Sequence, residues 1–175
     1  MRHLFSTCFL WPMILLLGGC GYHVGEIKPT PMRRVTTLAV NTFTNETLEP
    51  RVEAQTADAV VKQFQQDGTY RIDSADRADA ILEGTIQEIS RQPMRVLSSN
   101  VLQTSEFELL VKVKFRVIDR ITGAILMEGT AIGRTPFFAD SDLINTDLVT
   151  NQNMNYPIAA QRMAENLVSK VSEGW

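Results

Sequence analysis

Residues 107–118 alternate between two kinds of side chain, and this alternation limits the fold more than any other feature of the chain. One set of alternate positions is apolar: Phe107, Leu109, Val111, Val113, Phe115 and Val117. The positions between them are mostly charged: Glu108, Leu110, Lys112, Lys114, Arg116 and Ile118. Because successive side chains of a β-strand point to opposite faces, the pattern predicts a long strand with one buried and one solvent-exposed face. Such a strand needs a second layer of structure over its apolar face.

Three further strands are predicted around this one. Residues 35–43 and 80–90 are rich in β-branched and apolar residues, and 124–135 follows a turn at 119–123 as the hairpin partner. Residues 70–72 are consistent with a short edge strand. Glycines at three strand positions indicate a bulge or a close neighbour: Gly84, Gly129 and Gly133.

Two amphipathic helices complete the pattern. Val52, Val60 and Phe64 recur at helical spacing before a stop signal at 67–68. A second helix is expected to open at Pro157, because proline is favoured at the first helical position. The element order is then β-α-β-β-β-α. We predict an α+β fold, a two-layer sandwich with both helices on one face of a four-stranded mixed sheet.

The N-terminus has the profile of a bacterial lipoprotein signal. A basic start is followed by an apolar run over residues 4–17, and Leu17-Gly18-Gly19-Cys20 resembles a lipobox, the site of cleavage and cysteine acylation. The run is shorter than the stretch of about 20 apolar residues that spans a membrane. We therefore expect residues 1–19 to be removed as a signal peptide and 20–33 to form a leader lipidated on Cys20. Residues 34–175 then have the size of a single domain.

Cleavage at this site limits the chemistry of the mature chain. Cys8 and His3 leave with the signal, so that Cys20 is the only remaining thiol and is consumed by the lipid. The loss of Arg2 changes the formal charge from −3 to −4, which provides no field to attract nucleic acid. No nucleophile–base pair, phosphate-binding glycine loop or metal-ligand cluster is found in the sequence. We expect no enzyme, no metal and no cofactor other than the covalent lipid.

The residue after the cysteine indicates the compartment. In bacterial lipoproteins as a class, an aspartate at this position favours retention in the inner membrane, and here the position is Gly21. We therefore expect the protein on the periplasmic face of the outer membrane, held there by its acyl chains.

Arginines and apolar residues gather in the predicted connection at 91–106. Arg91 and Arg95 flank a Pro-Met pair, and arginine forks suit phosphate groups, so that a lipid head group or another anionic partner is one interpretation. Lys112 and Lys114 offer positive charge on the neighbouring strand. The simpler explanation for these two lysines is that they keep the outer face of the sheet solvated. Apolar residues in the connection indicate a partner: Met94, Val96, Leu97, Val101 and Leu102.

Several short motifs, spread over nearly the whole mature chain, match those of one family. They are Cys20-Gly21-Tyr22-His23, Leu38-Ala39-Val40-Asn41-Thr42-Phe43-Thr44-Asn45-Glu46-Thr47, Ala78-Asp79-Ala80-Ile81-Leu82-Glu83-Gly84, Thr104-Ser105-Glu106-Phe107, residues 119–123, Phe137-Phe138 and Ala164-Glu165-Asn166-Leu167. Together they resemble the lipopolysaccharide-assembly lipoproteins of the LptE family.

This resemblance implies an outer-membrane lipoprotein lodged inside a large β-barrel of the lipopolysaccharide translocon. There it acts as plug, assembly factor and lipopolysaccharide-binding component. Arg134 matches a family arginine and joins Arg91 and Arg95 as a candidate contact for lipopolysaccharide or another anion. Enterobacterial members carry basic residues at two positions that correspond here to the neighbourhoods of Asn100 and Asp147, where this chain departs from the family.

A second class of lipoprotein shares part of this pattern. Lipoproteins that activate peptidoglycan synthases, and related curli-secretion proteins, also show an Ala-Val-x-x-Phe-x-Asn strand and an Ala-Asp-x-x-Leu-x-Gly strand. Synthase activators usually carry a long disordered linker after the cysteine. In this chain only about a dozen residues separate Cys20 from the first predicted strand, a reach of at most roughly 40 Å, which favours a partner at the outer membrane itself.

Overall fold

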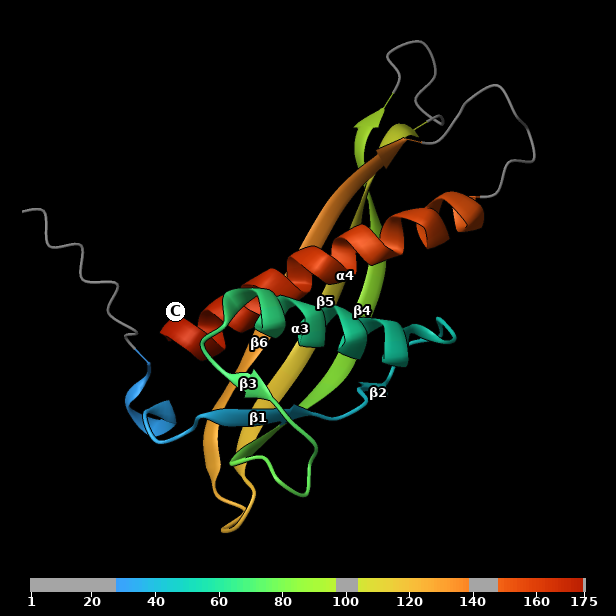
Figure 1. The fold of residues 1–175 in the computed structure, drawn as a ribbon. Coiled ribbons are helices and arrows are strands. Elements are labelled where there is room, and N and C mark those ends of the chain that lie inside the picture. Colours follow the sequence, from blue (N-terminus) through green and yellow to red (C-terminus); the bar gives the residue numbers. More distant parts are fainter. Residues whose placement is uncertain (1–27, 97–103, 139–147, 175) are drawn as a thin grey trace, which may run out of the picture.

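The structure is a computed structural model that describes residues 28–96, 104–138 and 148–174. A mixed sheet forms one layer, and two helices cover one of its faces (Figure 1). The predicted α+β class is confirmed. In chain order the elements are η2 (Thr30–Met32), β1 (Thr37–Val40), β2 (Thr44–Asn45), α3 (Val52–Asp67), β3 (Arg71–Ile72), β4 (Ala80–Val96), β5 (Thr104–Asp119), β6 (Ile125–Phe138) and α4 (Leu148–Glu173).

The sheet has six strands rather than the four predicted. The strand order is β3-β1-β4-β5-β6, and β2 also pairs with β4. β1 runs parallel to both β3 and β4, whereas β4, β5 and β6 form an antiparallel meander. The additional strands, β2 and β3, are two residues long. They are too short to carry an alternating pattern, and only β3 falls within the edge strand expected at 70–72.

Strand β4 continues well beyond the predicted end at residue 90. Cross-strand pairing with β5 carries it to Val96 through two irregularities in register around Arg95. In the described part of the chain, no strand flanks the other edge of β4 beyond Ile86, so Pro93 interrupts no second ladder. The predicted connection at 91–106 is therefore wrong at both ends, and only residues 97–103 lie between the two strands.

Helix α4 begins at Leu148, and Pro157 lies inside it rather than at its start. An internal proline removes one helical hydrogen bond and disfavours the turn before it. Side chains on both sides of the proline are buried against the rest of the domain, among them Tyr156, Ala159 and Ala160. Burial of this face stabilises the helix through Pro157, although proline by itself favours the first position of a helix.

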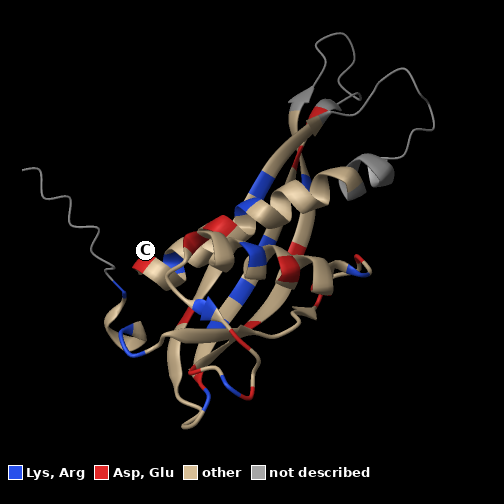
Figure 2. Cartoon of the chain, in the orientation of Figure 1, with Lys and Arg blue, Asp and Glu red and all other residues tan. Residues whose placement is uncertain are grey.

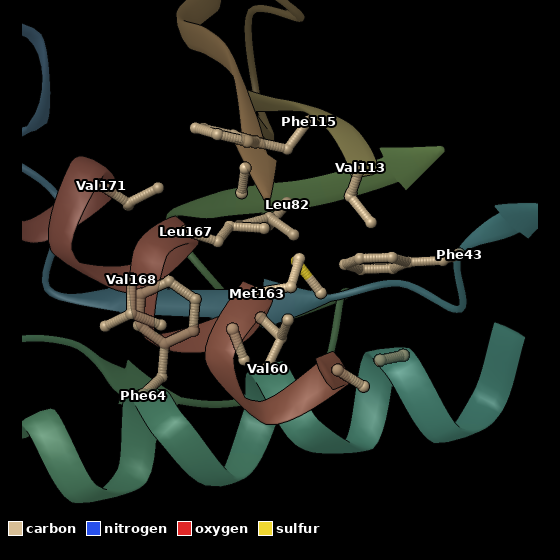
Figure 3. Close-up of a cluster of buried hydrophobic side chains, with 14 of the residues drawn as sticks. Phe43, Val60, Phe64, Leu82, Val113, Phe115, Met163, Leu167, Val168 and Val171 are labelled. Atoms are coloured by element: carbon tan, nitrogen blue, oxygen red, sulfur yellow. The ribbon is translucent and has the colours of Figure 1, made fainter. Parts of the chain in front are cut away.

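Both helices direct apolar faces at the sheet and form a single core with it. Figure 3 shows part of this core, with Val60 and Phe64 from α3, Met163 and Leu167 from α4, and Phe115 from β5. The core also reaches into the predicted leader, because Met32 of η2 is fully buried. Two strand glycines make room for aromatic rings of the core: a Cβ atom at Gly129 on β6 would meet the ring of Phe115, and one at Gly84 on β4 would meet the ring of Phe43. Both glycines lie opposite Phe115 in register.

Side chains of α4 close the outer edge of β6. The amide nitrogen of Ile132 donates to the Oδ1 atom of Asn166 at 3.3 Å, and the guanidinium of Arg162 donates to the carbonyl oxygen of Arg134 at 2.7 Å. An open edge with free amide and carbonyl groups would invite pairing with another chain. The Asn166 position, part of the closing motif noted in the sequence, thus satisfies a backbone group at this edge.

Substitution of Gly133 tests the close approach between α4 and the sheet. A Cβ atom at Gly133 would overlap the backbone of Ala159 and Met163, whereas one at Gly129 would meet only the ring of Phe115, at 2.9 Å. Backbone cannot move aside as a side chain can, so Gly133→Ala should lower the free energy of unfolding by about 3 kcal/mol. Gly129→Ala is the matched control with a smaller expected loss. Urea denaturation of both variants measures the difference, and equal losses would contradict the packing described here.

Candidate binding surfaces

The uncovered face of the sheet carries charges in rows across β4, β5 and β6. In one row Arg116 of β5 lies between Glu83 and Glu128, and its guanidinium contacts the Glu83 carboxylate at 2.8 Å. Near the other end of the strands, the Nε atom of Arg134 lies 3.7 Å from the Glu108 carboxylate. Figure 2 shows charges of both signs spread along these strands. Much of the charge on this face is therefore neutralised within the face itself.

Two lysines of this face remain without such a partner. Among the described residues, neither Lys112 nor Lys114 forms an ion pair, although Glu88 lies opposite Lys112 in register. A hollow of about 620 Å³ on the same face is lined by Lys114 and Arg116, but also by three carboxylates. These acids, Glu46, Glu83 and Glu128, do not favour an anion in the hollow.

The three candidate arginines do not form one site. Arg91 lies opposite the buried Leu109, on the face that the helices cover. The Arg91 side chain is exposed near the end of β4 at Val96, which we call the far end of the sheet. Arg134 lies opposite Leu110, on the uncovered face. Arg95 is opposite Glu106 in register. The structure therefore separates Arg91 and Arg134 by the thickness of the sheet, and whether any of the three binds an anion stays a prediction.

Apolar surface at the far end of β4 is represented by Met94, whose side chain is 57 % exposed. Close by in register, the rings of Phe107 and Phe137 stack with centroids 5.6 Å apart, and Pro93 lies opposite Phe107. Three of the apolar residues expected to mark a partner site lie outside the described residues: Leu97, Val101 and Leu102. The side chain of Val96 is likewise outside the described part.

Other sequence predictions also concern residues that the structure does not describe. These are the signal peptide, the acylation site Cys20 and the leader up to residue 27, together with Asn100 and Asp147. Cys20 remains the predicted lipidation site. Among the described helices, none combines the length and apolar character needed to cross a membrane.

Asp79, directly before β4, is hydrogen-bonded to the start of β1. Its Oδ2 atom accepts hydrogen bonds from the Thr36 hydroxyl at 2.7 Å and from the amides of Thr36 and Thr37 at 2.9 Å. In return, the amide of Asp79 donates to the Thr37 hydroxyl at 2.9 Å. The Thr36 hydroxyl and these amides hold the pKa of Asp79 well below its usual range. The Ala-Asp motif noted in the sequence thus has a structural role at this end of the domain.

A buried hydroxyl pair joins the two helices. Thr56 of α3 donates to the carbonyl oxygen of Val52, so the Tyr156 hydroxyl of α4 must be the donor in its 2.6 Å bond with Thr56. Burial raises the pKa of Tyr156 to about 12, which makes it a poor proton acceptor or donor in catalysis at neutral pH. The described residues contain no group of three or more His, Cys, Asp or Glu side chains placed to hold a metal ion.

Sequence reasoning overlooked a basic surface at the same end as Asp79. Arg33, Arg34 and Arg120 line a hollow of about 650 Å³ together with the hairpin residue Ile121. Arg33 and Arg34 directly precede the strand predicted at 35–43. A signal was present, since residues 28–45 contain three cations and no acidic residue.

A two-layer α+β domain with a polar open sheet face, preceded in the sequence by a segment that resembles a lipoprotein signal, is consistent with a small envelope lipoprotein. The family model described as LptE, lipopolysaccharide-assembly, matches residues 35–172. The chain therefore belongs to the LptE family, and the resemblance noted in the sequence is confirmed. It is an LptE-like lipoprotein of the cell envelope, in a family that is not enzymatic and that is associated with lipopolysaccharide transport. In a comparison with curated proteins, no sequence matches this chain.

Solved structures share the fold at low sequence identity. A hypothetical protein from Chlamydia trachomatis is 11% identical with a TM-score of 0.54, and the match covers 79% of this chain and 96% of that one. A protein from Xanthomonas campestris is 13% identical with a TM-score of 0.53, over 80% of this chain and 85% of that one. The PelC dodecamer from Paraburkholderia phytofirmans is 16% identical with a TM-score of 0.50, over 83% and 94%. At such identities the likeness concerns the fold alone.

Asp79→Asn should destabilise the domain in a pH-dependent manner. The pKa of Asp79 is lowered by folding, so its contribution is fully present above the unfolded value of about 3.9 and is lost as the pH falls through the lower folded value. We expect a loss of about 1–2 kcal/mol at pH 7, because the carboxylate is exposed and screened by water. The difference from wild type should shrink below about pH 4.

Asp58→Asn is the matched control for this experiment. Among the described residues, the Asp58 carboxylate pairs only with Lys62 on the exposed surface of α3, at 2.7 Å, so its loss should change stability by about 0.5 kcal/mol or less. Chemical denaturation at a series of pH values measures both variants. A pH-independent loss for Asp79→Asn would show that the charged carboxylate is not what stabilises this end.

Proposed function

We propose that this protein is an outer-membrane lipoprotein that plugs the barrel subunit of the lipopolysaccharide translocon. In that position it supports assembly of the barrel and aids insertion of lipopolysaccharide into the outer leaflet. The single observation that carries the proposal is the LptE family match over residues 35–172, which covers both layers of the fold. The lipobox at Leu17-Gly18-Gly19-Cys20 supports the anchoring, and Gly21 supports the choice of membrane.

The surface of the domain suits a polar enclosure. The interior wall of a transmembrane barrel is polar, so a plug must present polar groups on several sides without leaving many charges uncompensated. The open sheet face meets this requirement, because Arg116 pairs with Glu83 and Arg134 with Glu108 inside the face itself. The closed edge of β6 adds a side on which two backbone groups are already satisfied.

Affinity purification tests the barrel partner. The tagged lipoprotein, solubilised from outer membranes in mild detergent, should recover one large β-barrel protein in stoichiometric amount. A Cys20→Ser variant is the control for anchoring, since it should remain folded but lose the membrane and with it most of the barrel. Recovery of a peptidoglycan synthase in place of the barrel would overturn the proposal in favour of the activator class.

Lipopolysaccharide contact is proposed at Arg91, Arg95 and Arg134, acting at separate places. Because the sheet separates Arg91 from Arg134, their effects on binding should be independent. We expect Arg91→Gln and Arg134→Gln each to weaken lipopolysaccharide binding about fivefold to tenfold and the double variant to show the product. Titration of the purified protein with lipopolysaccharide measures this. Unchanged affinity in both single variants would remove these arginines from the function.

A further inference from the structure

The end of the domain at which the chain enters from Cys20 carries exposed positive charge. Lys28, Arg33 and Arg34 are the only charged residues within 28–45. Arg33 and Arg34 directly follow η2, are exposed, and form no ion pair with any described residue. Lys28 instead bends back, with its ammonium 4.7 Å from the centre of the Tyr70 ring and bonded to the carbonyl oxygen of Val35.

The hairpin between β5 and β6 contributes to the same surface. Arg120 and Ile121 in this turn line the hollow of about 650 Å³ together with Arg33 and Arg34. The Ile121 side chain is 82 % exposed at the tip of the turn. Figure 1 shows this turn and η2 at the same end of the molecule, opposite the far ends of β4, β5 and β6. We call these four residues, Arg33, Arg34, Arg120 and Ile121, the anchor-end surface.

The acids near this surface are engaged with the domain itself. Asp79 accepts three hydrogen bonds from Thr36 and Thr37 on one oxygen. Asp119 accepts three on its Oδ1 atom, from the amides of Ile121 and Thr122 and from the Thr122 hydroxyl. On the adjoining loop Asp73 pairs with Arg77 at 2.8 Å. Asp79 and Asp119 also line the hollow, and Arg120 donates through its Nε atom to the carbonyl oxygen of Ala78 at 2.6 Å. Arg33 and Arg34 therefore carry the free donors for an external anion, and Arg120 adds its remaining guanidinium nitrogens.

The length of chain before Lys28 limits how far this end can stand from the lipid. Lys28 lies eight positions after Cys20, a distance of at most about 29 Å when the chain is fully extended. Strand β5, with 16 residues, is on the order of 50 Å long, so the far end of the sheet lies beyond that reach when the anchor end is near the lipid. The anchor-end surface is therefore the described surface that the tether holds closest to the bilayer.

We propose that the anchor-end surface rests on anionic phospholipid head groups of the membrane that carries the acyl anchor. Arg33, Arg34 and Arg120 would contact the phosphates, and Ile121 would enter the interface beside them. This contact orients the domain, with β4, β5 and β6 pointing away from the bilayer. The inference rests on acylation of Cys20, part of the proposed function, for the position of the tether. The head-group contact itself belongs to the folded chain and needs neither lipid anchor nor barrel.

Vesicle binding by the mature chain without its anchor tests this contact. The protein from residue 20 onward, carrying Cys20→Ser, is sedimented with vesicles of phosphatidylglycerol and phosphatidylcholine or of phosphatidylcholine alone. We expect binding only to the anionic vesicles and a decline as salt is raised. Arg33→Gln with Arg34→Gln should lower the partition coefficient roughly 25-fold, about fivefold for each charge. Ile121→Ser should lower it severalfold as well.

A second double variant distinguishes binding through the anchor-end surface from an effect of overall charge. Lys62→Gln with Lys114→Gln removes the same charge from exposed positions on α3 and on the open sheet face, and it should bind the vesicles as wild type does. The mature chain is acidic overall, so its net charge repels anionic vesicles and cannot account for binding. Thermal denaturation of each variant confirms that it is folded.

Four outcomes overturn the inference. They are no binding to the anionic vesicles, equal binding to the neutral vesicles, equal losses in the two double variants, and, when lipopolysaccharide micelles are tested beside the vesicles, a loss for the arginine pair toward the micelles alone. Each outcome is separable from the proposed function. Recovery of the barrel with no vesicle binding removes only the head-group contact. Vesicle binding without recovery of the barrel removes only the translocon role.

Discussion

Helix α4 can lie flat across the sheet because Gly133 has no side chain, and much of the fold depends on that contact. The glycine lets the backbone of α4 approach β6 closely, which places Asn166 and Arg162 at the open edge of the strand. The same helix supplies Tyr156 to the buried hydroxyl pair with Thr56, which fixes α3 beside it. One close approach thus covers the apolar face, closes an edge and positions the second helix.

Elements with a strong local pattern could be predicted from the sequence, whereas those that depend on neighbours could not. The two faces of β5 follow from its alternation, and α3 follows from helical spacing and a glycine stop. Strand β4 continues through Pro93 because β5 pairs with it, a non-local cause that its own residues do not encode. Helix α4 likewise begins before Pro157 because tertiary burial outweighs a local start signal.

The candidate site was less accessible to sequence reasoning for a related reason. Arg91 and Arg134 share a residue type, but the face each occupies depends on strand register, and an irregularity after Ile86 shifts that register before Arg91 is reached. In contrast, the run of cations without acids around Arg33 and Arg34 is readable in the sequence. That these cations belong to a larger surface follows only from the structure, which places Arg120 and Ile121 beside them.

The helices cover one face of the sheet and α4 closes the edge at β6, so the open sheet face is the broad surface available to a protein partner. The charges on this face limit which partner can contact it. Removing a charge from water is costly unless the charge is paired. Arg116 and Arg134 bring their own carboxylates, whereas Lys112 and Lys114 make no ion pair within the described residues. A polar enclosure that contacts this face must therefore supply acidic or carbonyl groups opposite these two lysines or leave water there. The same argument favours a wet, polar partner wall over an apolar groove, because the rows of paired charge would lose solvation against apolar groups without gaining new bonds.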